Sequence, residues 1–343
     1  MDRVVSFCER IPEFEIKLNH IQIDAISPEL YCRKYLIHLL QHKTYFLTIY
    51  AIVLDKLVQH SIKKPNEISI IDIGAGNGLL ALFAKFVGFK EVYINDINER
   101  FVDASRQLSI QLQIGIDGFI CGGIKEVQLY FKSEVPDAVI GTDVIEHIYN
   151  LNDFFETIQL MNPEMVSVFT TASNPKNYFK VQHLRKLQRK DELEGGNPED
   201  NELFGEKPLA SFFSMRKEII NLHFNDIAAE DLNLLVQRTR GMIEADILKV
   251  INQFRLDGTL PPLHANDTNT CHPFSGSWTE RILQISDYQS IYQASGFRVK
   301  IYNGYYDEHK KGLKKLINKI LNVGVRILGI RIAPYIIFVG SKK

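Results

Sequence analysis

The sequence has few of the features that mark secreted, zinc-binding or membrane-spanning proteins. Its 343 residues include four cysteines, and no two of them have C-x-x-C spacing; they are Cys8, Cys32, Cys121 and Cys271. This usage argues against a disulfide framework and a zinc–thiolate site, and it is typical of a reducing compartment. No uncharged stretch approaches the roughly 20 apolar residues that a membrane crossing needs.

The sequence also lacks an excess of charge of either sign. It has 40 Lys and Arg against 41 Asp and Glu, a formal net charge of −1. Without a basic excess no global field attracts nucleic acid, so we do not expect a nucleic-acid partner. The first ten residues contain Asp2 and Glu9 and no sustained apolar run, which is unlike a signal peptide. We therefore expect a cytoplasmic protein.

A glycine-rich turn between a strand pattern and a helix pattern is the most informative motif present. Residues 68–80 read ISIIDIGAGNGLL, with Gly74, Gly76 and Gly78 at alternate positions. Such a turn brings backbone N–H groups close to a ligand, where any Cβ would block the approach. Eighteen residues after Gly78, a second strand pattern ends in Asp96. In a doubly wound sheet this carboxylate lies beside the turn and can accept hydrogen bonds from ribose hydroxyls, so we expect a nucleoside ligand.

The spelling D-I-G-A-G-N-G resembles motif I of class I S-adenosylmethionine-dependent methyltransferases, and Leu79 stands where dinucleotide folds have a third glycine. By this resemblance the loop would hold the methionine half of S-adenosyl-L-methionine, and Asp72 would lie near its ammonium group. Asp96 would bind the ribose and Ile97 would lie against the adenine. The predicted cofactor-binding residues are Asp72, Gly74, Ala75, Gly76, Gly78, Asp96, Ile97 and Thr142. The alternative interpretation is a tight turn without a ligand.

Strand and helix patterns alternate along much of the chain, which indicates a parallel sheet with right-handed crossovers. Beyond Asp96 the patterns predict, in order, a helix capped by Asn98, strands at 127–131 and 137–142, a helix at 151–161, a strand at 165–171, and a closing strand–helix–strand unit at 297–340. The predicted fold is α/β, a class I methyltransferase (Rossmann-like) doubly wound seven-stranded sheet. Its cofactor-binding domain would comprise residues 61–175 and 284–343.

Two segments lie outside this pattern. Residues 1–60 form a helical N-terminal extension, and residues 176–283 form a large, mainly helical insertion after the fifth strand. Because the insertion leaves the carboxyl end of a parallel strand, it emerges at the ligand-binding edge of the sheet. We therefore interpret it as a substrate cap, with structural padding or a homodimer surface as the alternatives.

The residues that can carry chemistry follow the fourth strand. Asp143, Glu146 and His147 are spaced i, i+3 and i+4, so they share one face if a helix begins there. Two carboxylates and an imidazole are suitable ligands for Mg²⁺, Mn²⁺ or Fe²⁺. The acidic-x-x-Glu-His spelling resembles the metal-binding motif of small-RNA 3′-end 2′-O-methyltransferases, although Asp143 replaces the usual glutamate. These three are the candidate catalytic residues and, with His264 and His272, the candidate metal ligands.

Two interpretations of the same residues need no metal. His147 can act alone as a general base on an acceptor hydroxyl. Alternatively, Asp143 and Glu146 form a capping box that only starts a helix. The sequence leaves these possibilities open beside metal binding.

A second polar segment precedes the closing unit of the fold. Residues 271–281 read Cys-His-Pro-x-Ser-Gly-x-Trp-x-Glu-Arg and contain the only tryptophan. This spelling resembles a segment of methyltransferases from bacterial surface-polysaccharide gene clusters, which implies a sugar acceptor. His272, Trp278 and Arg281 are the candidate substrate-binding residues, because aromatic and polar groups together suit a sugar. The alternative is an ordered loop that packs Trp278 into a core.

The C-terminal tail is strongly basic. Residues 310–343 contain nine Lys or Arg and no acid, and they include an amphipathic helix pattern. Such a helix can rest on an anionic membrane surface as a peripheral contact. We favour the other interpretation, in which the helix packs on the sheet with its lysines in water.

Three functional hypotheses follow. The leading one is an S-adenosylmethionine-dependent O-methyltransferase acting on a sugar hydroxyl, of a nucleotide-activated sugar such as a GDP-linked heptose or of a polysaccharide, in capsule or O-antigen biosynthesis. The second is a metal-dependent RNA 2′-O-methyltransferase, which the neutral pI opposes. The third is a non-catalytic nucleoside-binding scaffold, which the intact glycines and Asp96 oppose.

Overall fold

The structure, a computed structural model, describes residues 6–132, 134–195, 210–224, 226–262 and 269–342. The chain divides into two compact units, which are described separately below. The sheet unit comprises Met1–Ile145, Asn150–Ala172 and Ile285–Lys343. The helical unit comprises Glu146–Tyr149 and Ser173–Gln284.

The sheet unit is built on seven strands, in the order β3-β2-β1-β4-β5-β7-β6. The strands are β1 (Ser69–Ile73), β2 (Glu91–Asp96), β3 (Gly118–Cys121), β4 (Ala138–Thr142), β5 (Val166–Thr171), β6 (Phe297–Asn303) and β7 (Ile336–Lys342). The first five are parallel, and β7 runs antiparallel to both β5 and β6. This confirms the predicted class I methyltransferase fold.

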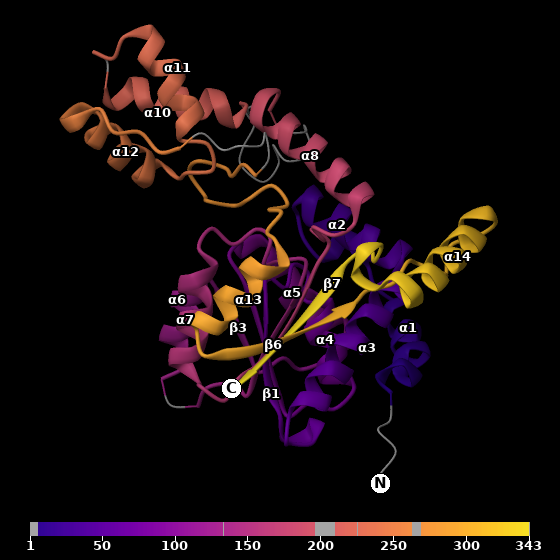
Figure 1. Ribbon diagram of the computed structural model, residues 1–343. Coiled ribbons are helices and arrows are strands. Elements are labelled where there is room, and N and C mark those ends of the chain that lie inside the picture. Colours follow the sequence, from indigo (N-terminus) through magenta and orange to yellow (C-terminus); the bar gives the residue numbers. More distant parts are fainter. Residues whose placement is uncertain (1–5, 133, 196–209, 225, 263–268, 343) are drawn as a thin grey trace. The chain divides into compact units, whose positions relative to one another are not determined.

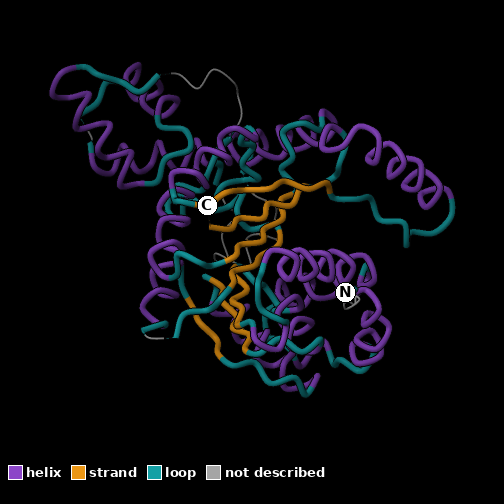
Figure 2. Tube along the Cα trace, turned by 60° about the horizontal axis from the view of Figure 1, so that its bottom comes forward, coloured by secondary structure: helices purple, strands orange, loops and turns teal. Residues whose placement is uncertain are grey.

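Helices lie on both sides of the twisted sheet (Figure 2). The helices of this unit are α1 (Ile11–Leu18), α2 (Leu30–Gln41), α3 (Lys43–His60), α4 (Leu79–Phe86), α5 (Glu99–Leu112), α6 (Ile124–Tyr130), α7 (Leu151–Met161), α13 (Ile285–Ala294) and α14 (Leu313–Leu328), with 3₁₀ turns η1 (Phe7–Arg10), η2 (Ile23–Ala25), η3 (Pro65–Glu67) and η4 (Gly329–Arg331). On one face of the sheet, buried apolar side chains of α1–α5 pack with those of the strands in a single core. On the other face, Phe155 of α7 packs against Tyr292 of α13, with ring centroids 4.2 Å apart.

The sequence patterns located most elements correctly. Asn98 caps α5, since its side chain accepts a hydrogen bond from the backbone N–H of Arg100 at 3.0 Å. The strand predicted at 127–131 is wrong, because those residues belong largely to helix α6. Glu126 accepts a hydrogen bond from the N–H of Gly123 at 2.8 Å and so satisfies the start of that helix. The third strand is instead the short segment Gly118–Cys121.

The order of strands places the predicted cofactor residues at one edge of the sheet. β1 lies between β2 and β4, and Asp72 is in register with Ile94 on one side and Ile140 on the other. The chain therefore reverses its direction of winding beside β1, and the carboxyl ends of such strands border the ligand crevice of doubly wound folds. Asp96 and Thr142 end the two neighbouring strands at the same edge.

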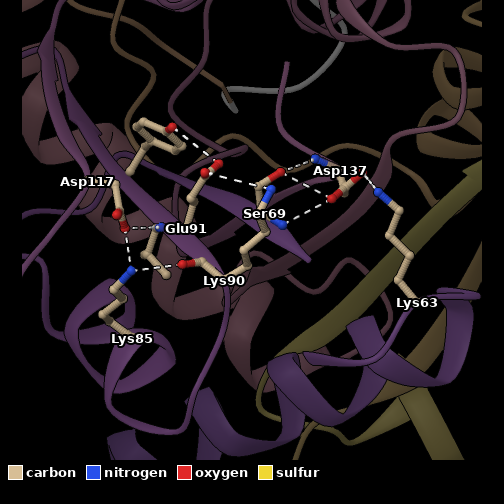
Figure 3. A network of polar contacts seen from close by, with 9 residues as sticks. Lys63, Ser69, Lys85, Lys90, Glu91, Asp117 and Asp137 are labelled. Atoms are coloured by element: carbon tan, nitrogen blue, oxygen red, sulfur yellow. Dashed lines mark hydrogen bonds and ion pairs between the residues drawn. The ribbon is translucent and has the colours of Figure 1, made fainter. Parts of the chain in front are cut away.

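The opposite edge of the sheet is held by charged side chains (Figure 3). Asp137 accepts hydrogen bonds from Ser69, from its N–H at 3.0 Å and its hydroxyl at 3.1 Å, and forms an ion pair with Lys63 at 2.6 Å. Asp117 accepts from the N–H of Val92 at 2.8 Å and from Lys85 at 2.6 Å. Burial raises the pKa of Asp137, but the bonds and charge of Lys63 and the bonds of Ser69 outweigh it and leave this pKa below its usual value.

Helix α14 does not pack as we expected. Most of its apolar side chains face solvent, and those that are 45–76% exposed are Leu313, Leu316, Ile317, Ile320, Val323, Ile327 and Leu328. The expectation of a helix packed on the sheet through its apolar face is therefore wrong. The face that is buried carries Asn322 and Val325.

The helical unit has its own small core. Its helices are α8 (Tyr178–Leu193), α10 (Phe212–His223), α11 (Ala229–Arg238) and α12 (Glu244–Asp257). Apolar side chains of the last three form one buried cluster: Ile219, Ile220, Leu232, Leu235, Val236, Ile247 and Ile251. The guanidinium of Arg216 is fully buried and contacts both carboxylate oxygens of Glu192, at 3.1 and 2.5 Å. Such a bidentate pair fixes α10 against α8. Across the described residues of both units, no helix combines the length and apolar character that a membrane span requires.

Candidate functional site

The glycine turn after β1 has a backbone that other residues adopt only with strain. Gly74, Gly76 and Gly78 have φ angles of 64°, 54° and 74°, in the left-handed region that favours glycine. A Cβ on Gly74 would lie 2.4 Å from a methyl group of Val144, and one on Gly78 would lie 2.7 Å from Ile94. The turn is therefore a close-packed cradle that needs all three glycines.

Asp96 lies directly beside this cradle. Its Oδ2 accepts a hydrogen bond from the N–H of Gly76 at 2.9 Å, and its Oδ1 accepts from the N–H of Asn98 at 2.9 Å. Each carboxylate oxygen can accept about two hydrogen bonds, so acceptor capacity remains for two ribose hydroxyls. Burial raises the pKa of Asp96, and the backbone donors partly counter that effect.

Asp72 is buried below the turn. Its Oδ2 accepts from the N–H of Ala81, in the first turn of α4, at 3.1 Å. Burial raises the pKa of Asp72 well above its usual value, and the nearby carboxylate of Asp96 raises it further. A cationic group beside Asp72 would lower this pKa and stabilise the charged carboxylate. The ammonium group expected near Asp72 is such a cation.

The N-terminal extension covers the glycine turn, which the sequence patterns did not indicate. A Cβ on Gly76 would lie 2.8 Å from Cε1 of Tyr35, a residue of α2. Asn77 donates from its side chain to the carbonyl oxygen of Cys32, also on α2, at 3.0 Å. Burial, followed by the charge of Asp143, raises the pKa of Tyr35, so its phenol is neutral at physiological pH. Tyr35 is thus a candidate cofactor-contacting residue.

The remaining predicted cofactor residues lie around the same edge. Ala75 donates its N–H to the carbonyl oxygen of Asn95 at 3.0 Å, which ties the turn to β2. Ile97 is 75% exposed, so its apolar side chain is accessible to a planar ligand. Thr142 ends β4 in register with Thr170. These residues fit S-adenosylmethionine. The glycine turn leaves room for its methionine half, Asp72 and Asp96 suit its ammonium group and ribose, and the exposed side chain of Ile97 suits its adenine.

The segment after β4 is a turn and contains no helix start. Asp143 has a φ of 52°, and its N–H donates to the carbonyl oxygen of Thr170 at 3.1 Å. Residues 145–147 form a turn, and α7 begins only at Leu151, where Asn150 supplies the cap. The helical face that Asp143, Glu146 and His147 would share is therefore not formed, and the capping-box interpretation lacks its helix.

The helical unit nevertheless brings two of these residues together with a third. The ligand atoms of Glu146, His147 and Glu280 all lie within 4.8 Å of one another. Glu146 is fully buried, and Glu280 accepts a hydrogen bond from the hydroxyl of Ser173 at 2.9 Å. Glu280 has a φ of 47°, a conformation that costs energy for a residue with a side chain and is often found at functional sites. Two carboxylates and one imidazole at this separation suit a divalent cation.

The orientation of His147 is fixed by the strand-like segment that carries Glu280. Nδ1 of His147 lies 2.8 Å from the carbonyl oxygen of Trp278. A carbonyl can only accept, so Nδ1 carries the proton of the neutral ring and Nε2 keeps its lone pair. Metal-bound histidines have this arrangement, in which the second nitrogen donates to a backbone carbonyl. The lone pair of Nε2 can serve either as a ligand or as a base.

Trp278 holds this segment in place. Its indole N–H donates to the carbonyl oxygen of Tyr149 at 3.2 Å, and its ring stacks on that of Tyr149 with an interplanar angle of 15°. The guanidinium of Arg281 lies 4.2 Å from the centre of the indole ring. Trp278 is only 8% exposed. These contacts favour the packing interpretation of Trp278, since little of its ring remains for a substrate.

Of the two other predicted histidine ligands, only His272 lies among the described residues. His264 lies outside the described residues. His272 accepts hydrogen bonds at Nδ1 from the N–H groups of Phe274 and Ser275, at 3.3 and 3.2 Å, and is not among the clustered ligands. Burial lowers the pKa of His272. Glu280 is the ligand candidate that the sequence patterns missed, although it stands within the polar segment they identified.

Comparison with known proteins agrees with this reading of the sheet unit. Residues 71–161 match the family model described as "Methyltransferase domain". A ubiquinone biosynthesis O-methyltransferase from Rickettsia akari (strain Hartford) is 23% identical over 128 residues, 37% of this chain and 49% of that protein. The chain therefore spans about half the length of the curated relative that it matches.

Two solved structures show the extent of the similarity in three dimensions. A magnesium protoporphyrin IX methyltransferase from Synechocystis PCC 6803, with bound SAH, has 12% identity and a TM-score of 0.37 over 86% of this chain and 82% of that one. The YcgJ protein from Bacillus subtilis has 12% identity and a TM-score of 0.43 over 85% and 98%. From the family match, the glycine motif and the order of the strands together, we conclude that the chain contains a class I S-adenosylmethionine-dependent methyltransferase domain.

Proposed function

We propose that the protein is an S-adenosylmethionine-dependent O-methyltransferase that methylates a sugar hydroxyl and uses a divalent cation held by Glu146, His147 and Glu280. The observation that carries this proposal is the convergence of these three side chains within 4.8 Å. Glu146 follows the end of β4 by four positions in the chain, in the sequence region that predicts the chemistry.

The residues of the cradle would hold the methyl donor. S-adenosylmethionine, when bound, supplies an electrophilic methyl group on a sulfonium. The glycine turn allows close approach to its backbone because it lacks Cβ atoms, Asp96 offers acceptors for the ribose, and Asp72 offers a negative charge for the ammonium. The ring of Tyr35 lies beside Gly76, at the position that a Cβ would need.

The acceptor hydroxyl needs activation, because an alcohol is a poor nucleophile at neutral pH. A divalent cation supplies Lewis acidity, which lowers the pKa of a nearby hydroxyl by several units. The chain contributes two carboxylates and the oriented Nε2 of His147. Without a cation, the same Nε2 can accept the proton directly, which typically contributes about 10²–10⁴-fold. Both routes require His147.

An oxygen acceptor is supported by the ubiquinone biosynthesis O-methyltransferase among the relatives. A sugar is supported by residues 271–281, whose spelling resembles methyltransferases of surface-polysaccharide clusters. A nucleotide-activated or polysaccharide-bound sugar, in capsule or O-antigen synthesis, fits that resemblance, with residues 176–283 selecting the acceptor. A phenolic hydroxyl is the second candidate, because the same relative acts in ubiquinone biosynthesis.

The test is methyl transfer from labelled S-adenosylmethionine to a panel of nucleotide sugars, catechols and short RNAs. We expect transfer to a nucleotide sugar, loss of turnover with a chelator, and recovery with Mg²⁺, Mn²⁺ or Fe²⁺. Transfer only to catechols or RNA would refute the sugar assignment. Turnover that a chelator does not change would refute the cation and leave His147 as a base.

Two variants place the chemistry on the cluster. His147→Ala should reduce turnover by at least about 10²-fold while S-adenosylhomocysteine binds normally. Glu280→Gln should weaken activation by the divalent ion. The matched control is His20→Ala, since His20 is exposed and lies in the other unit. Full turnover in His147→Ala would exclude the cluster from the reaction.

A further inference from the structure

Helix α14 is turned so that a polar face is packed and an apolar face is exposed. Asn322 accepts a hydrogen bond from the N–H of Tyr306 at 2.7 Å and donates to the carbonyl oxygen of the same residue at 2.9 Å. Asn318 donates to the carbonyl oxygen of Asp307 at 2.5 Å. Because Asn318 and Asn322 are four residues apart, they share one face of the helix. This asparagine face anchors α14 to the loop that follows β6.

The opposite face is a continuous apolar surface. At about 100° per residue, the exposed apolar positions occupy an arc of roughly 140°. Its members are Leu313, Leu316, Ile317, Ile320, Val323, Ile327 and Leu328. In Figure 1, α14 is a long yellow helix that extends away from the strands of its unit. A water-soluble surface rarely leaves so many apolar side chains in one patch unless the patch meets a partner.

Positive charge borders this apolar arc. Lys315, Lys319 and Arg326 project from adjacent angular positions at one margin of the arc, and Lys314 lies near the other margin. All four side chains are exposed. Long cationic side chains beside an apolar face can reach lipid headgroups while the apolar face enters the acyl boundary.

The C-terminal tail is basic, whereas the rest of the chain carries a net negative charge. Residues 310–343 hold nine of the 40 Lys and Arg and none of the 41 acids, so residues 1–309 hold 31 basic and 41 acidic residues, a net charge of −10. An anionic surface would attract the tail and repel the rest of the chain, which fixes the orientation of binding. A second copy of α14 would instead bring like-charged margins together.

We propose that α14 lies in the surface of an anionic lipid bilayer, with its apolar arc inserted and its basic margins at the headgroups. This proposal does not depend on the acceptor of the methyl group. It identifies a peripheral membrane attachment of the sheet unit through a helix that its own core does not use.

The experiment is co-sedimentation of the full-length protein with vesicles of phosphatidylcholine, alone or mixed with phosphatidylglycerol. We expect binding to the mixed vesicles that weakens at high salt, and little binding to phosphatidylcholine alone. Ile320→Glu should reduce binding to the mixed vesicles at least about tenfold, because it places a charge in the apolar arc. Ile110→Glu on α5 is the matched control, since both isoleucines are 63% exposed.

A second variant tests the charge. Lys315→Glu with Lys319→Glu leaves the apolar arc unchanged and should also lose binding to the mixed vesicles. Absence of binding to anionic vesicles, equal binding to both vesicle types, or normal binding by Ile320→Glu would overturn the proposal. So would a dimer in solution that Ile320→Glu dissociates while vesicles remain unbound, because a second copy would then cover the face.

Discussion

The Nδ1 atom of His147 lies 2.8 Å from the carbonyl oxygen of Trp278, so a backbone group of one segment sets the tautomer of a candidate catalytic residue in another. Two backbone hydrogen bonds also join the segments, each 3.1 Å long. The N–H of Trp278 donates to the carbonyl oxygen of His147, and the N–H of Arg281 donates to the carbonyl oxygen of Glu146. The position of Glu280 between Trp278 and Arg281 in sequence depends on this pairing. Outer contacts of this kind commonly orient the ligands of a metal site.

The first prediction concerns the indole of Trp278. Trp278→Leu keeps an apolar side chain but removes the stack on Tyr149 and the hydrogen bond to its carbonyl oxygen. We expect Mn²⁺ affinity to fall about 10–100-fold, the usual cost of losing an outer-shell contact. Calorimetric titration with Mn²⁺ measures it. Phe274→Leu, at an exposed position of the same segment, is the control. Unchanged affinity in Trp278→Leu would show that the indole does not position the cluster.

The second prediction concerns the glycine cradle. Gly76→Ala places a Cβ 2.8 Å from Tyr35, whereas Gly88→Ala meets no atom within 4 Å although its φ is also positive, at 101°. Both variants should lose about 1–2 kcal/mol of stability from the backbone conformation. Only Gly76→Ala should also bind S-adenosylhomocysteine at least about tenfold more weakly. Thermal unfolding and titration together separate the two effects, and equal ligand affinity in both variants would contradict the prediction.

The arrangement of the predicted cofactor residues around the turn could be derived from the sequence because it is local. The strand, turn, helix and acidic strand end lie within residues 68–96. The residue types there indicate each feature directly: glycines indicate the turn, and the carboxylate at the strand end indicates a hydrogen-bond acceptor. The fold could be predicted for a similar reason, since β-α alternation constrains the winding of a parallel sheet. Tyr35 was missed, because no spacing rule relates a tyrosine on α2 to a glycine turn 41 residues later.

The third ligand of the cluster could not be located for a different reason. Glu280 follows Glu146 by 134 residues and reaches it through segment pairing that no local pattern specifies. Helix α6 was misread because Val127, Leu129 and Phe131 alternate as in a strand, yet Leu129 is 71% exposed. The orientation of α14 depends on Asn318 and Asn322, whose partners in the 306–308 loop are visible only in the structure.

The third prediction separates the two parts of the Tyr35 side chain. Its ring packs over Gly76, while burial keeps its phenol neutral by raising the pKa. Tyr35→Phe should therefore bind S-adenosylhomocysteine almost normally, and Tyr35→Ala should lose about tenfold in affinity because it removes the ring beside the glycine turn. Fluorescence titration of both variants measures this. A large loss in Tyr35→Phe would show that the hydroxyl itself contacts the ligand.

The last prediction concerns stability against pH at the edge of the sheet remote from the cradle. Asp137 has a pKa below its usual value in the folded protein, because the contacts with Lys63 and Ser69 outweigh its burial. Its stabilising effect is therefore complete above the unfolded-state pKa of about 3.9 and is lost as the pH falls through the lower folded-state value. Asp137→Asn should lower the free energy of unfolding at neutral pH by about 1.5–3 kcal/mol, the range for hydrogen bonds to a charged group. The difference in unfolding free energy between the variant and the wild type should narrow below about pH 4, as the wild-type carboxylate becomes protonated.

Denaturant unfolding from pH 3 to 7 tests this, with Asp103→Asn as the control because the Asp103–Arg106 pair is exposed. A difference that stays constant over this pH range would contradict the assignment of the effect to the Asp137 charge.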